Sequence, residues 1–218
     1  FGKVLNYISG YKTENINPNQ AFDMACNDEM ETISQIYKQY ETKRKEMKAL
    51  DFDDLLLEAH KLLKKCERGR TKWQNRLDYI HVDEFQDVDP IQYDIIRLLT
   101  SNTCRLCVVG DPDQTIYTWR GASVDIIMRF DLDFPDCKTV ILDQNYRSIQ
   151  PILDASNALI RNNQNRIQKD LFSTIAGNQK IKMQNCIDDN DEPLFVSRQI
   201  IELRKKGVEF KDIAILYR

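Results

Sequence analysis

Long hydrophobic runs are missing from this chain of 218 residues. None approaches the roughly 20 apolar residues of a membrane-spanning helix. The first residues, FGKVLNYISGYK, also lack the basic, apolar and small-residue zones of a secretory signal. With 42% hydrophobic and 30% charged residues, the composition is typical of globular proteins. We therefore expect a cytoplasmic protein with no membrane partner, folded as one large domain or two small ones.

Residues suited to a zinc site or a disulfide framework are few. The chain has only two histidines, His60 and His81, and its six cysteines are scattered. Cys104 and Cys107 form a CxxC, but no second pair or nearby histidine accompanies them. They also lie in a strand-like run, where positions i and i+3 face opposite sides. Reduced, packed thiols are expected, as in cytosolic proteins.

A strong charge of one sign is absent as well. The formal net charge is −3, so the overall charge does not indicate a nucleic-acid-binding protein. Any such site has to be a local patch. The basic clusters at residues 43–45, 64–70 and 204–206 are typical of solvated helix faces rather than of a track for phosphates.

The first part of the chain has helical periodicity. Apolar side chains recur through residues 20–48 at the spacing of one helix face. Asp51 then predicts the start of another helix, because Asp54 follows three residues later as in a capping box. We therefore expect one helix over 20–48 and a second that begins after Asp51.

From residue 79 onward, strand-like and helix-like segments alternate. The predicted strands are 79–82, 106–109, 139–142, 181–187 and 213–217. The predicted helices are one that begins at Pro90, then 122–130, 151–160 and 192–206. Alternation of this kind predicts an α/β fold with a parallel sheet, in which ligands bind beyond the carboxyl ends of the strands.

The first candidate site is the stretch YIHVDEFQD, in which Asp83 and Glu84 directly follow an apolar strand. Adjacent carboxylates repel each other unless a cation compensates, which favours a divalent metal. The alternative is a strand end followed by a solvated acidic turn. The pair has the form of a Walker B site. One carboxylate would hold Mg²⁺ through water, and its neighbour would orient or deprotonate the attacking water.

The second candidate site is VGDPDQTIYTWRGA, residues 109–122. The amide of Gln114 is suited to a γ-phosphate or a water, since it offers both a donor and an acceptor. Tyr117, Trp119 and Arg120 resemble a platform for unpaired bases, worth about 1–3 kcal/mol per stacked base. The alternative is that Trp119 belongs to the core and Arg120 to a surface ion pair.

The third candidate site is LDQNYRS, residues 142–148. Tyr146 could stack on a purine, and Arg147 could neutralise a phosphoryl group during transfer.

Together, DEFQD, GDPDQTIYTWRGA and QNYRS resemble motifs II, III and IV of superfamily 1 DNA helicases of the UvrD/PcrA/Rep type. ALDFDDLL, residues 49–56, resembles the family segment before motif II. The resemblance extends from about residue 48 to the last residue. It implies a RecA-like P-loop NTPase motor core of α/β class. Residues 51–135 would be the later part of the first motor domain and residues 136–218 the start of the second. Residues 1–50 would end a helical accessory segment.

The resemblance also implies a role for each matching residue. ATP and Mg²⁺ would be required, and the family couples ATP hydrolysis to 3′-to-5′ movement on single-stranded DNA and to unwinding of partly duplex DNA. The implied roles are Asp83 as the Mg²⁺ residue, Glu84 as the catalytic base, Gln114 as the γ-phosphate contact, Tyr117 and Trp119 as stacking residues for single-stranded bases supported by Arg120, Tyr146 as the adenine-stacking residue and Arg147 as an arginine finger.

One expected motif is absent. The phosphate-cradling loop G-x-x-x-x-G-K-[ST] does not occur, and the only Gly-Lys pair, Gly2-Lys3, is followed by Val4. The C-terminal motifs of the family are also missing. We therefore expect an internal fragment that neither hydrolyses ATP nor unwinds DNA by itself, and whose incomplete sheet leaves an edge open to self-association.

Three alternatives remain at this point. The chain could come from the motor of a RecB/AddA-type helicase–nuclease. It could be a metal-dependent nuclease that uses Asp83, Glu84, Asp87 and Asp111. It could also be an interaction module without catalytic activity.

Overall fold

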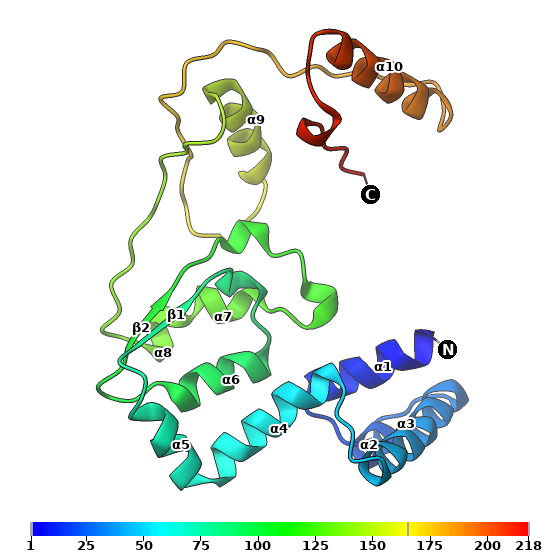
Figure 1. Cartoon of the computed structure of the whole chain (residues 1–218), viewed down its shortest axis with the longest axis vertical. Coiled ribbons are helices and arrows are strands. Elements are labelled where there is room, and N and C mark those ends of the chain that lie inside the picture. Colours follow the sequence, from blue (N-terminus) through cyan, green and yellow to red (C-terminus); the bar gives the residue numbers. More distant parts are fainter. Residues whose placement is uncertain (1, 165, 218) are drawn as a thin grey trace. The chain divides into compact units, whose positions relative to one another are not determined.

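The computed structural model describes residues 2–164 and 166–217, which divide into two compact units. Unit 1 consists of residues 2–143 and the described part of Leu159–Asp170. Unit 2 consists of Gln144–Ala158 and residues 171–217. All the elements are labelled in Figure 1 along the chain, except the short 3₁₀ turns.

Unit 1 begins with three helices: α1 (Gly2–Thr13), α2 (Pro18–Asp23) and α3 (Asp28–Glu46). The single helix predicted over 20–48 is therefore wrong. The Asn27 side chain accepts the backbone N–H of Met30 and starts a new helix there, so the chain breaks between α2 and α3. The apolar side chains that pack between these helices are Ile8, Tyr11, Ala21, Ile33 and Tyr37.

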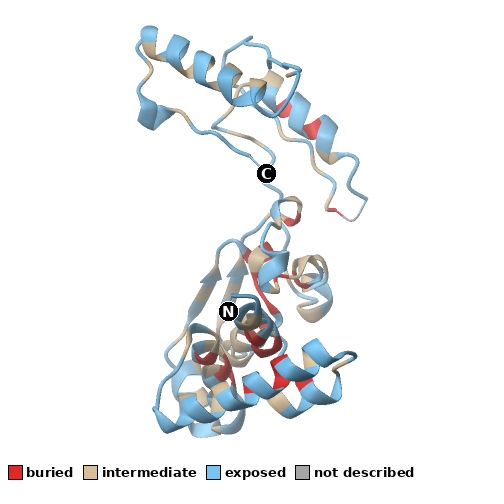
Figure 2. Ribbon diagram, turned by 90° about the vertical axis from the view of Figure 1, so that its right-hand side faces the viewer, coloured by how far each residue is buried: buried red, intermediate tan, exposed pale blue. Residues whose placement is uncertain are grey.

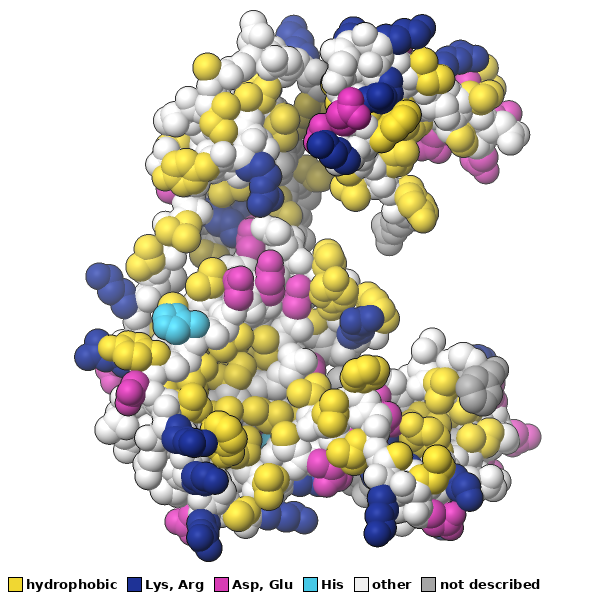
Figure 3. Space-filling view, viewed as in Figure 1, with side chains coloured by type: hydrophobic (Ala, Val, Ile, Leu, Met, Phe, Trp, Pro, Cys, Tyr) yellow, Lys and Arg dark blue, Asp and Glu magenta, His cyan; other side chains and the backbone are white. Residues whose placement is uncertain are grey.

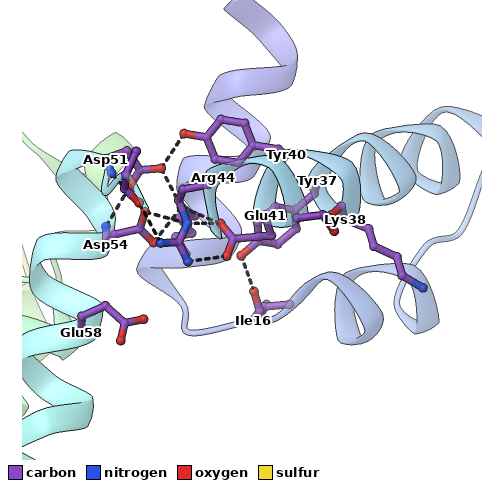
Figure 4. Close-up of polar contacts among 12 residues, drawn as sticks. Ile16, Tyr37, Lys38, Tyr40, Glu41, Arg44, Asp51, Asp54 and Glu58 are labelled. Atoms are coloured by element: carbon purple, nitrogen blue, oxygen red, sulfur yellow. Dashed lines mark hydrogen bonds and ion pairs between the residues drawn. The ribbon is translucent and has the colours of Figure 1, made fainter. Parts of the chain in front are cut away.

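Helices α4 (Phe52–Lys65) and α5 (Glu67–Gln74) follow. The predicted capping box is confirmed, since Asp51 accepts the N–H of Asp54 at 2.8 Å and Asp54 accepts the N–H of Asp51 at 3.1 Å. Asp51 and Asp54 also bind Lys12 of α1, which joins α4 to the N-terminal helices. Figure 4 shows the carboxylates of this cluster together with Tyr40 and Arg44.

The sheet of unit 1 has two parallel strands in the described chain, β1 (Tyr79–Val82) and β2 (Arg105–Val108). Helix α6 (Pro90–Leu99) connects them, with Asp89 as its N-cap and Pro90 in its first turn. Both strands and the helix start at Pro90 are confirmed. After β2 come α7 (Val124–Met128) and α8 (Phe130–Asp133), shorter than the single helix predicted over 122–130.

A second core lies beside this sheet. Phe85 is completely buried and packs edge-on against the rings of Tyr93 of α6 and Phe130 of α8. Val88 and Ile126 complete the buried cluster. The chain that leaves β1 is thus anchored one residue after its two carboxylates.

Unit 2 contains most of α9 (Gln150–Ile160), all of α10 (Asp191–Lys205) and a 3₁₀ turn at Phe210–Asp212. The segment at residues 171–173 lies alongside α9. Asn157 exchanges two hydrogen bonds with Leu171, and Gln150 accepts the N–H of Ser173. The helices predicted over 151–160 and 192–206 are confirmed.

The strands predicted at 139–142, 181–187 and 213–217 are wrong, because none of these segments is a strand in the described chain. Their side chains are largely exposed, with Met183 at 91% and Leu216 at 96% (Figure 2, pale blue). An apolar segment becomes a strand only where a neighbouring backbone accepts its hydrogen bonds. In unit 2 only an isolated bridge between Gln144 and Phe172 is present among the described residues.

On the surface of unit 1 drawn in Figure 3, hydrophobic side chains are interspersed with basic and acidic ones. Among the exposed apolar side chains are Phe52, Leu55 and Leu62 of α4. None of the helices in the described chain is both long and apolar enough to cross a membrane.

Candidate functional site

The first two motifs leave the same edge of the sheet. Val82 of β1 is paired with Val108 of β2, and Val109 donates to the carbonyl of Val82 at 2.8 Å. The N–H of Phe85 returns a bond to the carbonyl of Val109 at 2.9 Å. Because the strands are parallel, the Asp83–Asp87 loop and the loop that begins at Gly110 emerge side by side.

The carboxylates of Asp83 and Glu84 lie at this edge and both residues are exposed. Glu84 has a φ of 49° and a ψ of 43°, in the left-handed region that residues with a side chain seldom occupy. Its N–H donates to Asp83 Oδ1 at 2.9 Å, and buried Phe85 follows it. The fold therefore maintains a strained backbone at the residue expected to act as a base.

The donor set at this edge fits Mg²⁺ with nucleotide phosphates. Mg²⁺ usually keeps several waters and binds one or two carboxylates in addition to phosphate oxygens. Asp83 supplies one exposed carboxylate. The described residues contain no group of three or more His, Cys, Asp or Glu side chains placed to hold a metal. Asp83, Glu84, Asp87 and Asp111 therefore do not form the metal cluster that the nuclease alternative requires.

Gln86 connects the two loops. Its amide nitrogen donates to Glu84 Oε2 at 2.7 Å, and its carbonyl oxygen accepts the N–H of Asp111 at 3.0 Å. Asp111 in turn accepts from the amide of Gln114 at 2.8 Å. Glu84 and Gln114 are therefore joined through two intervening residues, by the side chain of Gln86 and by the backbone N–H and side chain of Asp111.

Two cations reach the same loop from the segment after α9. Lys169 Nζ binds Asp111 Oδ1 at 2.5 Å, and Arg166 Nη2 binds Asp113 Oδ2 at 2.9 Å. Burial by itself would raise the pKa of Asp111, but the hydrogen bonds from Lys169 and Gln114 outweigh it, and the pKa is lowered. Asp111 is thus held as a carboxylate.

The aromatic residues of the second motif are displayed at the surface. Trp119 is 72% exposed and Tyr117 is 40% exposed, with ring centroids 6.3 Å apart. The guanidinium of Arg120 lies over the Trp119 ring, 4.6 Å from its centroid, and also near the Tyr117 ring. The alternative of a core Trp119 is therefore wrong. Gly121, at φ 90°, ends the turn that presents them.

The third motif lies in unit 2. The side chain of Asn145 accepts the backbone N–H groups of Arg147 and Ser148, at 2.9 and 2.8 Å, and so fixes the turn before α9. Tyr146 is 77% exposed and donates from its hydroxyl to Gln144 Oε1 at 2.9 Å. Arg147 is exposed. The side chains of Tyr146 and Arg147 are thus both accessible at the surface of unit 2.

Sequence reasoning missed three residues of this site. Gln86 lies within the first motif, but the sequence does not show whether its amide is buried or at the surface. The one sequence feature that could have indicated its role is its position directly after the aromatic residue Phe85. Arg166 and Lys169 gave no local signal, because their partners lie 53 and 58 residues earlier in the chain.

Comparison with known proteins supports the resemblance to UvrD-type helicases. The family profile for the UvrD/REP helicase N-terminal domain matches residues 2–135, and the profile for the UvrD-like helicase C-terminal domain matches residues 140–218. These families have the P-loop NTPase fold, and the parallel β1–β2 pair with its crossover helix is compatible with it.

Individual relatives agree over nearly the whole chain. The "Probable DNA helicase II homolog" of Mycoplasma capricolum is 41% identical over 216 residues, which cover 99% of this chain and 30% of the relative. The ATP-dependent DNA helicase PcrA of Staphylococcus aureus is 39% identical over 214 residues, which cover 98% of this chain and 29% of the relative. The chain thus spans about 30% of the length of these curated relatives. With both profiles matched in order and with these identities, the chain belongs to the UvrD/PcrA-type family of DNA helicases.

Proposed function

We propose that the whole protein is an ATP-dependent DNA helicase. It hydrolyses ATP with Mg²⁺, moves 3′-to-5′ along single-stranded DNA and unwinds partly duplex DNA in the cytoplasm. The observation that carries the proposal is the hydrogen-bonded connection from Glu84 to Gln114, five residues before the exposed ring of Trp119. A nucleotide-sensing group and a base-stacking group thereby share one short loop.

The proposed architecture is a RecA-like motor. Residues 51–135 would be the later part of the first motor domain and residues 136–218 the start of the second, with residues 1–50 as the end of a helical accessory segment. The parallel strands and the crossover through α6 support a RecA-like sheet.

At the nucleotide, each motif has a separate task. Asp83 would hold Mg²⁺, which supplies charge stabilisation for phosphoryl transfer. Glu84 accepts a proton from the attacking water. The amide of Gln114 contacts the γ-phosphate, Tyr146 stacks on the adenine, and Arg147 neutralises charge on the transferred group.

At the DNA, Tyr117 and Trp119 stack on unpaired bases and Arg120 holds their rings in place. Base stacking of this kind tolerates any sequence, because every base has a π-face. A shift of Gln114 with the state of the phosphate changes the loop that carries Trp119. This gives ATP hydrolysis a physical route to movement along the strand.

The experiment is a Gln114→Ala substitution in the whole protein. We expect DNA-stimulated ATP turnover to fall at least about tenfold, because the contact that reports the γ-phosphate is removed. Gln74→Ala is the matched control, since the Gln74 amide also donates one hydrogen bond, to the carbonyl of Leu98 at 2.8 Å, but Gln74 belongs to neither motif. Unchanged DNA-stimulated turnover in Gln114→Ala would refute the coupling.

A further inference from the structure

Gln86 is a buried residue between two exposed functional loops. Its side chain is 1% exposed, whereas Asp83 and Glu84 before it are exposed. The amide nitrogen donates to Glu84 Oε2 at 2.7 Å and lies 3.4 Å from Asp87 Oδ2, and the amide oxygen accepts the N–H of Asp111. All the polar atoms of this side chain are thus used within the site.

The orientation of the amide is determined by these partners. If the oxygen and nitrogen were exchanged, the oxygen would face the carboxylates of Glu84 and Asp87, and the nitrogen would face the N–H of Asp111. Both contacts would be repulsive and would leave buried polar groups without partners. Only one orientation therefore joins the carboxylate of Glu84 to the backbone of Asp111.

The space around Gln86 is also restricted. A Cβ atom at Gly110 would lie 2.7 Å from Gln86 Oε1 and 3.0 Å from the backbone nitrogen of Phe85. Only glycine at this position lets β2 end so close to the amide. Glu84, whose backbone is left-handed, places its carboxylate against the same amide. The Gln86 side chain is therefore enclosed by Gly110 on one side and by Glu84 on the other.

We propose that Gln86 is a positioning residue of the motor. It orients the carboxylate of Glu84 toward the attacking water and, through Asp111, couples that carboxylate to the phosphate-contacting amide of Gln114. With its side chain buried, Gln86 would act through these two residues rather than by contact with the nucleotide. The inference rests on the proposed function, because it assigns Glu84 and Gln114 the roles given above.

A purely structural role would have a different signature. A buried glutamine that only satisfies its neighbours would affect stability, and any loss of activity would follow the loss of folded protein. A positioning residue changes the rate of the chemical step, because misplacement of a base by about 1 Å costs up to about 100-fold. We expect substrate affinity to change little, since the Gln86 side chain is only 1% exposed.

The experiment compares Gln86→Met with wild type in the whole protein. Methionine fills the same space without hydrogen bonds. We expect kcat for DNA-stimulated ATP turnover to fall about 10- to 100-fold, with KM for ATP changed less than about twofold. Gln86→Glu, which keeps the shape but turns a negative charge toward Glu84, should lower kcat at least as much. Gln74→Met is the matched control and should keep the wild-type kcat.

A second measurement needs no substitution. In the isotope-labelled wild-type 218-residue polypeptide, a scalar coupling across the hydrogen bond from the Asp111 nitrogen to the Gln86 side-chain carbonyl carbon is expected. Absence of this coupling would overturn the inference, even if the substituted proteins failed to fold. An unchanged kcat in Gln86→Met would overturn it and leave the proposed function intact. Absence of DNA-stimulated ATP turnover in the whole wild-type protein would overturn both.

Discussion

Lys12 is a buried cation surrounded by three carboxylates. Its side chain is 1% exposed, and its Nζ lies 2.6 Å from Asp51, 2.9 Å from Asp54 and 2.9 Å from Glu41. Burial by itself would lower the pKa of Lys12, but the hydrogen bonds to these carboxylates outweigh it and the pKa is raised. A single side chain thus holds α1, α3 and α4 together.

We expect Lys12→Met to lower the free energy of unfolding by about 3–5 kcal/mol, because it removes the buried cation that all three carboxylates share and leaves only Arg44, which contacts Glu41 and Asp54. Urea unfolding followed by circular dichroism measures this. Lys3→Met is the control, since the Lys3–Glu29 pair is exposed on both sides and its loss should not measurably change the midpoint. Equal midpoints for Lys12→Met and Lys3→Met would contradict the assignment.

Asp51 makes the same cluster sensitive to acid. Burial would raise its pKa, but the hydrogen bonds from Lys12 and Tyr40 lower the pKa to about 2, from an ordinary value of 3.8. A carboxyl group whose pKa is lowered in the folded state stabilises the fold above its unfolded pKa. That contribution is lost as the pH falls from about 4 to about 2.

We therefore expect the free energy of unfolding to decrease between about pH 4 and about pH 2, with a smaller slope in Asp51→Asn than in wild type. Urea titrations at stepped pH measure both slopes. Identical slopes in the two proteins would mean that Asp51 is not the titrating group.

Among the elements, the segment after α9 is tied to the second motif by buried charges. The side chains of Arg166 and Asp113 are 2% and 7% exposed, and Arg166 Nε donates to Asp113 Oδ2 at 3.2 Å in addition to the Nη2 contact. By contrast, Arg161 and Asp170 in the same segment form an exposed pair. The buried pair therefore holds the segment, and the exposed pair contributes little.

We expect Arg166→Met to cost about 3–5 kcal/mol of stability, because Asp113 would remain buried without its main cation. Arg161→Met should leave the unfolding midpoint unchanged. Hydrogen exchange of the Pro112–Gln114 turn provides a local measurement and should become faster only in Arg166→Met. Protection that is retained in this variant would show that the pair does not hold the turn.

Secondary-structure elements that depend on residues close together in the sequence were predicted correctly, and the strands predicted after residue 138, which require a distant partner, were not. The helix starts at Asp51 and Asp89 were correct, because a capping side chain bonds to N–H groups two or three residues away. β1 and β2 were correct because each is a short apolar run that ends at polar residues. The strands predicted at 139–142, 181–187 and 213–217 were wrong, because strand formation requires a partner that no local pattern specifies.

For the whole molecule, the sequence contains no G-x-x-x-x-G-K-[ST] loop. We therefore expect the 218-residue polypeptide alone to show no Mg²⁺-dependent ATP turnover, because it lacks the N–H groups and lysine that hold the β- and γ-phosphates. A coupled ATPase assay with single-stranded DNA measures this, with Glu84→Gln as the background control. Turnover above that of Glu84→Gln would disprove the expectation.

We also propose that the polypeptide alone self-associates. The described sheet has two strands, so each strand has one side without a paired strand. Unpaired edges are templates for pairing with another chain. A mass measured by light scattering that rises with concentration would support this, and a constant monomer mass would exclude it.

Local sequence was sufficient for the family and for the capped helix starts, because these depend on residue types at short, fixed spacings. Long-range contacts became visible only in the folded chain. Gln86 meets Asp111 across 25 residues, Lys12 meets Asp51 across 39, and Arg166 meets Asp113 across 53. The physical reason is that side-chain bonds over such separations depend on how helices and strands pack. No periodicity or capping pattern along the chain encodes that packing.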